Sequence, residues 1–198
     1  MQRTTPPTGA ALAPVDPESG VLVHTRADRE LAIEHWFLAT HPAPEQVRAE
    51  WTQAGVALLP LGTLFSAVRI PASLVVAAVG SDKHTDVDAL LEEVLDGGPV
   101  ICDPRHRRYY ALVPGSMPDR WHDAAEDWRP LGVECLGRGW YLGVPRLQAA
   151  ELNPEAWASY WSVPMPSAAV LCQPLAVARL IAVGQRRMGQ EPSEVVHA

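Results

Sequence analysis

The chain has 198 residues, of which 47% are hydrophobic and 20% are charged, and its formal net charge is −7. This composition is typical of one globular domain with a substantial core. The acidic balance excludes bulk electrostatic attraction to nucleic acid, so nucleic-acid binding would need a local basic patch. No apolar run approaches the roughly 20 residues of a membrane helix, and no secretory pattern opens the chain. We therefore expect a cytoplasmic protein without membrane contact.

The amino-terminal half is predicted to contain a disordered leader followed by helices and strands. Residues 1–20 hold four prolines and little that could be buried, which predicts the leader. The apolar periodicities then predict a short strand at 21–23, helices at 28–40 and 44–53, and strands at 56–61, 64–70 and 73–79. The last of these is a nearly continuous β-branched run, which is typical of a strand buried on both faces.

The second half is predicted to alternate between strands and helices. Asp86 is the expected N-cap of a helix at 87–95. The later elements are expected to be strands 99–102 and 108–113, helix 118–128, a hairpin of strands 131–135 and 140–144, helix 153–161, and helix 167–188 kinked at Pro174. The prediction is an α/β (α+β) fold with a mixed sheet flanked by helices. Its expected parts are a domain at 21–150, a helical extension at 151–190 and a frayed tail at 191–198.

The three cysteines, Cys102, Cys135 and Cys172, are odd in number and widely spaced, and none lies in a C-x-x-C pair. This argues against a disulfide framework and against a structural zinc site. Cys102 and Cys135 could meet Asp103 and His106 as metal ligands, but no spacing requires it. The favoured interpretation is that the thiols are small buried hydrophobic groups in a reducing compartment.

Three segments between Leu74 and Pro145 occur in an order that carries a resemblance. Residues 133–145 read acid, Gly-x-Gly, aromatic, apolar strand and proline, with Glu134 as the acid. Residues 107–114 contain a basic start, two tyrosines and a proline. Residues 74–80 form an apolar run that ends at Gly80.

Together these segments resemble the amino-terminal domain of bifunctional DNA primase–polymerases, in the archaeo-eukaryotic primase superfamily. The resemblance covers about a third of the chain and implies a primase–polymerase-like fold with a role in DNA replication. It implies that Glu134 is a metal-binding carboxylate and that Arg108 stands where the family has a histidine. It also places Ala78 and Gly80 where the family has two further acids.

The replaced acids bear on catalysis. Nucleotidyl transfer needs two divalent cations, and Mg²⁺ needs carboxylate oxygens, which alanine and glycine lack. We therefore expect a catalytically degenerate domain with no cofactor, in which Mg²⁺ would be bound only if catalysis were retained. A third alternative is an active nucleotidyltransferase in which Asp86 or Asp88 replaces the lost acids, which requires one of them to lie close to Glu134.

The expected ligand of the former active-site face is a nucleotide, a nucleic acid or a protein partner. Arginine suits bidentate phosphate contacts, and exposed aromatic rings can stack on bases. The candidate binding residues are Arg105, His106, Arg107, Arg108, Tyr110, Arg138 and Trp140. The alternative interpretation is that residues 105–108 form a solvated turn in which one arginine pairs with Asp103. Another alternative is a protein-interaction module without nucleic-acid function, which the seven tryptophans and the acidic charge also fit. Convergence of the arginines would distinguish the two.

Overall fold

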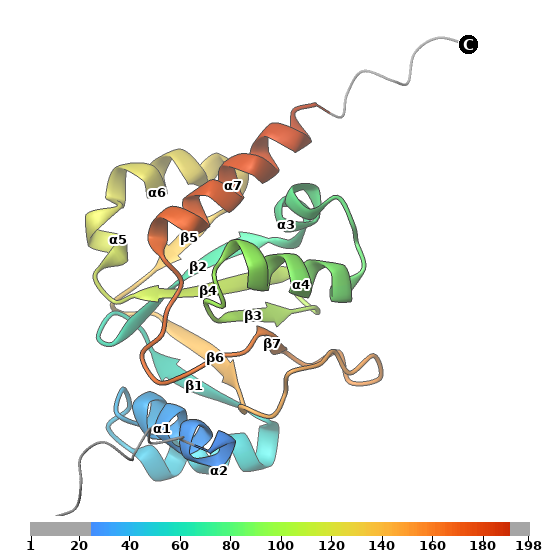
Figure 1. Cartoon of the computed structure of the whole chain (residues 1–198). Helices are drawn as coiled ribbons and strands as arrows, with labels where there is room; N and C mark the ends of the chain where they lie inside the picture. The colour runs from blue at the N-terminus through green and yellow to red at the C-terminus, as the bar shows by residue number, and fades with distance from the viewer. Residues whose placement is uncertain (1–24, 191–198) are drawn as a thin grey trace, which may run out of the picture.

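The computed structural model describes residues 25–190 (Figure 1), so the expected leader, the strand at 21–23 and the tail lie outside the described residues. The helices are α1 (Arg26–Leu38), α2 (Pro44–Ala54), α3 (Ala72–Val79), α4 (His84–Val94), α5 (Met117–Arg120), α6 (His122–Trp128) and α7 (Pro174–Met188), with a 3₁₀ turn η1 at Arg129–Leu131. The strands are β1 (Val56–Pro60), β2 (Phe65–Pro71), β3 (Val100–Asp103), β4 (Arg108–Pro114), β5 (Glu134–Leu136), β6 (Tyr141–Pro145) and β7 (Tyr160–Val163).

The strands form two sheets, one of five strands in the order β5-β2-β4-β3-β7 and one of two strands, β1-β6. Every pairing is antiparallel. The expected mixture of α and β structure in one domain is confirmed, although the sheet itself is not mixed. Within residues 25–190, no helix combines the length and apolarity that a bilayer crossing requires.

The five-stranded sheet separates two apolar clusters, because successive side chains of a strand point to opposite faces. On β4, Tyr109 and Ala111 pack with α3, α4 and α7, whereas Leu112 packs with α1, α2 and the small sheet. Figure 1 shows the same layering, with α1 and α2 beside β1 and β6, and the remaining helices on the other side of the large sheet. The core is therefore two layers of side chains on one shared sheet.

The two sheets are joined at a corner where two connections cross closely. The β1–β2 connection passes the β5–β6 connection so tightly that a Cβ on Gly62 would lie 2.4 Å from the backbone nitrogen of Arg138. Gly62 also has a φ of 90°, which favours glycine. The predicted hairpin of 131–135 and 140–144 is therefore wrong, because β5 pairs with β2 and β6 pairs with β1.

The apolar run predicted as a strand at 73–79 is helix α3. Pro71 precedes the helix, and Gly80 ends it in the left-handed conformation with a φ of 80°. Leu74, Val75 and Ala78 form its buried face, which packs on α7. Tertiary packing of this face overrides the β propensity of its valines. Ala78 and Gly80 therefore do not lie on a strand, and the proposed counterpart of the family's acidic strand is lost.

Other differences concern helix boundaries in the later part of the chain. The helix predicted at 118–128 is two short helices that meet at Trp121. The helix predicted at 153–161 is instead a turn, in which the carboxamide oxygen of Asn153 accepts from two backbone amides, followed by β7. The long helix predicted at 167–188 begins only at Pro174. Strand β7 belongs to the main sheet, so the region after residue 150 is not a purely helical extension.

Candidate anion-binding site

The basic loop between β3 and β4 is held against the start of α3. The carbonyl of Arg107 accepts a hydrogen bond from the amide of Ala72 (2.9 Å), and the amide of Arg107 donates to Pro104 (3.4 Å). Arg107 has a left-handed φ of 53°, which is uncommon for a residue other than glycine. Such conformations persist where the surrounding structure fixes them, so the loop is shaped before any ligand arrives.

This loop borders a cavity of about 510 Å³. The cavity lies between the loop, the first residue of α4 and the segment that precedes β7. Its polar and aromatic lining consists of Arg105, Arg107, Arg108, His84, Asp82, Asp103, Tyr109 and Trp157. Trp157 is 48% exposed and, like Arg107, has a left-handed φ. Three guanidiniums, a histidine at a helix N-terminus and an accessible indole therefore share one cavity.

The three arginines keep their charges available to the cavity. Arg105 donates from Nη2 to the carbonyl of Ala156 (2.7 Å), which fixes its direction. Among the described residues, none of the three guanidiniums forms an ion pair. The expected alternative, an arginine paired with Asp103, is wrong because that carboxylate binds Nδ1 of His106 at 2.7 Å. His106 is therefore committed to Asp103 and is absent from the cavity wall.

A chain of hydrogen bonds leads from the cavity into the protein. Nδ1 of His84 lies 3.1 Å from Oη of Tyr160, which lies 3.2 Å from Oδ2 of Asp88. The hydroxyl of Ser162 donates to the other oxygen of the same carboxylate. Because Tyr160 has a single hydrogen and donates it to Asp88, His84 donates its Nδ1–H to Tyr160. The nitrogen left for a ligand is then Nε2.

Asp88 should make stability depend on pH. Burial raises the pKa of its carboxyl above the ordinary value of 3.8, although hydrogen bonds from Ser162 and Tyr160 partly oppose this. A raised pKa means that the folded state holds the proton more tightly than the unfolded state. The resulting stabilisation is complete below pH 3.8 and is lost as the pH rises through the folded-state pKa.

We therefore expect Asp88→Asn, which cannot ionise, to lose less stability than the wild type as the pH rises from 3.8 through the folded-state pKa of Asp88. Urea unfolding at several pH values measures this difference. Parallel stability profiles of the two proteins would show that ionisation of Asp88 is not coupled to folding.

The three thiols do not supply a nucleophile. Burial raises the pKa of Cys102 and that of Cys135 to about 11 each and the pKa of Cys172 to about 12, so all three thiols stay protonated at neutral pH. The proposed meeting of Cys102 with Cys135 does not occur, because β3 and β5 are separated by two strands. Within the described residues, no three His, Cys, Asp or Glu side chains cluster closely enough to hold a metal ion.

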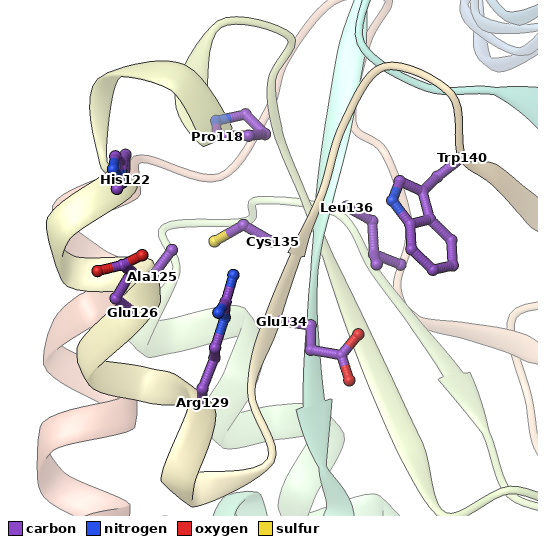
Figure 2. Close-up of a pocket in the computed structure, with 9 residues that line it drawn as sticks. All are labelled: Pro118, His122, Ala125, Glu126, Arg129, Glu134, Cys135, Leu136 and Trp140. Carbon is purple, nitrogen blue, oxygen red and sulfur yellow. The ribbon is translucent and has the colours of Figure 1, made fainter.

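Glu134 lies outside the cavity by the basic loop and is paired. It lies opposite Arg69 on β2, and the two side chains form an ion pair. Figure 2 shows the carboxylate of Glu134 on the same side of β5 as Trp140. The guanidinium of Arg69 thus lies beside Glu134, where the resemblance implies a bound metal ion. Asp86 and Asp88 offer no substitute, since α4 packs by β7, at the opposite edge of the sheet from Glu134.

The remaining predicted binding residues do not line this cavity. Arg138 lies at the Gly62 corner, at the opposite end of β2 from Arg108. Tyr110 is half-buried on the face that packs against α1 and α2, and burial raises its pKa. Trp140 borders a different pocket beside β5. Three of the four arginines whose convergence was in question therefore converge, and Arg138 does not.

Comparisons with protein-family models, with curated proteins and with solved structures give no match for this chain. His84 and Trp157 were missed as site residues. The signal for His84 is its place at the start of a helix after the Ser81-Asp82-Lys83 turn. Trp157 carries no local signal, because only the tertiary fold brings it to the arginines.

Proposed function

We propose that this chain is a primase–polymerase-like domain that has lost nucleotidyl transfer and binds a phosphate-bearing ligand, a nucleotide or a nucleic-acid strand, in the cavity by the basic loop. The observation that carries the proposal is the convergence of Arg105, Arg107 and Arg108 with Trp157 around one cavity. Arginine is well suited to phosphate, and indole offers a face for base stacking.

The amino-terminal end of α4 adds to the attraction for an anion. His84 is the first residue of this eleven-residue helix, and its side chain lines the cavity. The free amides and the dipole of a helix N-terminus favour negative charge. Asp82 and Asp103 also line the cavity and oppose this attraction, but the three arginines outnumber the two carboxylates. A local basic site of this kind accommodates binding to a chain whose net charge is −7.

The loss of catalysis is proposed because Glu134 is paired with Arg69 and because, among residues 25–190, no three His, Cys, Asp or Glu side chains cluster closely enough to hold a metal ion. Binding should then not require a metal ion. We expect ATP to bind with equal affinity in Mg²⁺ and in EDTA, as measured by isothermal titration calorimetry. We also expect no incorporation of deoxynucleotides on a primed template. Mg²⁺-dependent incorporation that is abolished by Glu134→Ala would overturn the proposed loss of catalysis.

Stacking on Trp157 can be separated from phosphate binding. Trp157→Ala should lower the affinity for ATP about tenfold, since stacking of one base contributes roughly 1–3 kcal/mol. It should leave the affinity for pyrophosphate unchanged, because pyrophosphate has no ring. Trp140→Ala is the matched control, as Trp140 is similarly exposed (53%) and lies outside the cavity. Equal losses for ATP and pyrophosphate would argue that Trp157 only shapes the cavity.

A function in protein binding is the second candidate. Three apolar side chains on the small sheet are more than half exposed: Leu58 on β1, Tyr141 on β6, and Trp140 directly before β6. Exposed apolar side chains that lie close together indicate interaction surfaces more often than isolated ones do.

A further inference from the structure

The sheets of this protein have four outer strand edges, and at three of them a hydrogen bond from elsewhere in the chain occupies a main-chain group of the edge strand. Open strand edges invite pairing with another chain, and proteins commonly block them. The blocking hydrogen bonds involve the main chain of β7, β1 and β6: Trp161 N to Ala149 O (2.7 Å), Leu58 N to Glu50 Oε2 (2.9 Å), and Trp161 Nε1 to Pro145 O (3.2 Å).

The fourth edge, on β5, is the exception. β5 ends the sheet order and pairs with β2 on its inner side. In the described part of the chain, no hydrogen bond reaches the main chain of residues 134–136 from its outer side. One residue before β5, the amide of Val133 donates a hydrogen bond to the carbonyl of Trp128 (3.3 Å). β5 therefore presents main-chain donors and acceptors that only an added strand would pair in ladder geometry.

A pocket of about 590 Å³ surrounds this open edge. Figure 2 shows its lining side chains on both sides of β5: Cys135 points toward α5 and α6, whereas Glu134, Leu136 and Trp140 lie on the other side. An added strand would alternate its side chains in the same way. The pocket therefore provides room on both faces of such a strand, which a blocked edge does not.

The two sides of the pocket differ in chemistry. One side has the largely buried Leu136 and the exposed Trp140, which suit apolar side chains. The other side is formed by α6, where Glu126 and the following Arg129 line the pocket, while Asp123 and Asp127 are exposed on the same helix outside the lining. The three acids of this helix outnumber Arg129, which favours basic side chains on this side.

We propose that the outer edge of β5 binds an extended peptide segment of a partner protein by strand addition, with apolar residues toward Trp140 and basic residues toward α6. Main-chain pairing supplies affinity in this mode, and the alternating side chains supply specificity. The proposal does not depend on the anion site, because the pocket beside β5 and the cavity by the basic loop share no lining residue.

The probe is a short synthetic peptide in which valine and lysine alternate, tested on the full chain. We expect the peptide to bind and to protect the amides of residues 134–136 from hydrogen exchange. A peptide of the same composition with its valines and lysines in two blocks controls for charge alone. In an extended peptide the N–H groups of successive residues point to opposite edges. Two further peptides therefore carry N-methyl groups on alternate residues, one peptide on the residues whose N–H points toward β5 and the other on the residues whose N–H points away. The first peptide should fail to bind, and the second should bind as well as the unmethylated peptide.

Matched protein variants test the two sides of the pocket. Trp140→Ala should weaken peptide binding about tenfold, as truncation of a central aromatic residue does in many interfaces, whereas Trp157→Ala should not. Glu126→Lys should weaken it, whereas Glu92→Lys on the distant α4 should not. Equal binding of the block peptide, or of both N-methylated peptides, would overturn strand addition. A concentration-dependent dimer that is lost in Trp140→Ala would overturn the peptide in favour of a second copy of this chain.

Discussion

Replacing Arg107 and Arg108 together with alanine is expected to weaken ATP binding about 100-fold, because each removes a charge-assisted hydrogen bond of roughly 1.4 kcal/mol or more. Affinity for single-stranded DNA should also fall, and its salt dependence should flatten by about 0.7 units of slope per lost phosphate contact. Stability should hardly change, since neither guanidinium forms an ion pair among the described residues. Titration calorimetry and urea unfolding of the same preparations measure both effects.

The control for this change is Arg138→Ala together with Arg146→Ala, two exposed arginines that do not border the cavity. This control removes the same charge and should leave the affinity for ATP nearly intact. The opposite pattern, a large loss of stability with unchanged affinity in the Arg107 and Arg108 variant, would mean that these arginines hold the fold together. The phosphate site would then lose its physical support.

The second large effect is expected from Gly184→Val, at the contact between α7 and α3. A Cβ on Gly184 would lie 2.4 Å from the carbonyl oxygen of Leu74, so α7 would have to move away from α3. Overpacking of this kind costs about 3 kcal/mol. Gly189→Val is the control, because a Cβ there meets its neighbours at 3.6 Å. Thermal and urea unfolding measure the difference, and similar stabilities for the two variants would show that α7 shifts at little cost.

The strands were predictable where the sequence punctuates them. β1, β2, β3 and β4 are short apolar runs bounded by glycine, proline or polar residues, and the predicted ranges differ from the observed ones by a residue or two. Helix α3 was not recognised, although Pro71 and Gly80 mark its start and end. Its run of valine and alanine fits a buried strand and a buried helix equally well, and only its packing on α7 decides between them.

The candidate site was predictable only in its local part. The density of arginines between 105 and 108 marks the basic loop, and the loop itself is confirmed. The partners that make it a cavity, His84 and Trp157, come from segments about 20 and 50 residues away in the chain, and no periodicity connects them. Likewise, the pairing of Glu134 with Arg69 follows from the register of β5 on β2, which local patterns do not specify.

The crossing at Gly62 also has a consequence for the order in which the chain can fold. β1 and β2 are consecutive in the sequence but separate into different sheets, and each waits for a partner synthesised much later: Val56 pairs with Pro145, and Arg69 pairs with Glu134. Closing such long loops costs entropy before any contact compensates for it. The two-stranded sheet therefore cannot be completed on the ribosome until residue 145 has emerged, and the five-stranded sheet not until residue 163 has emerged. Refolding should be slow, on a timescale of about milliseconds to seconds, as in other proteins of high contact order.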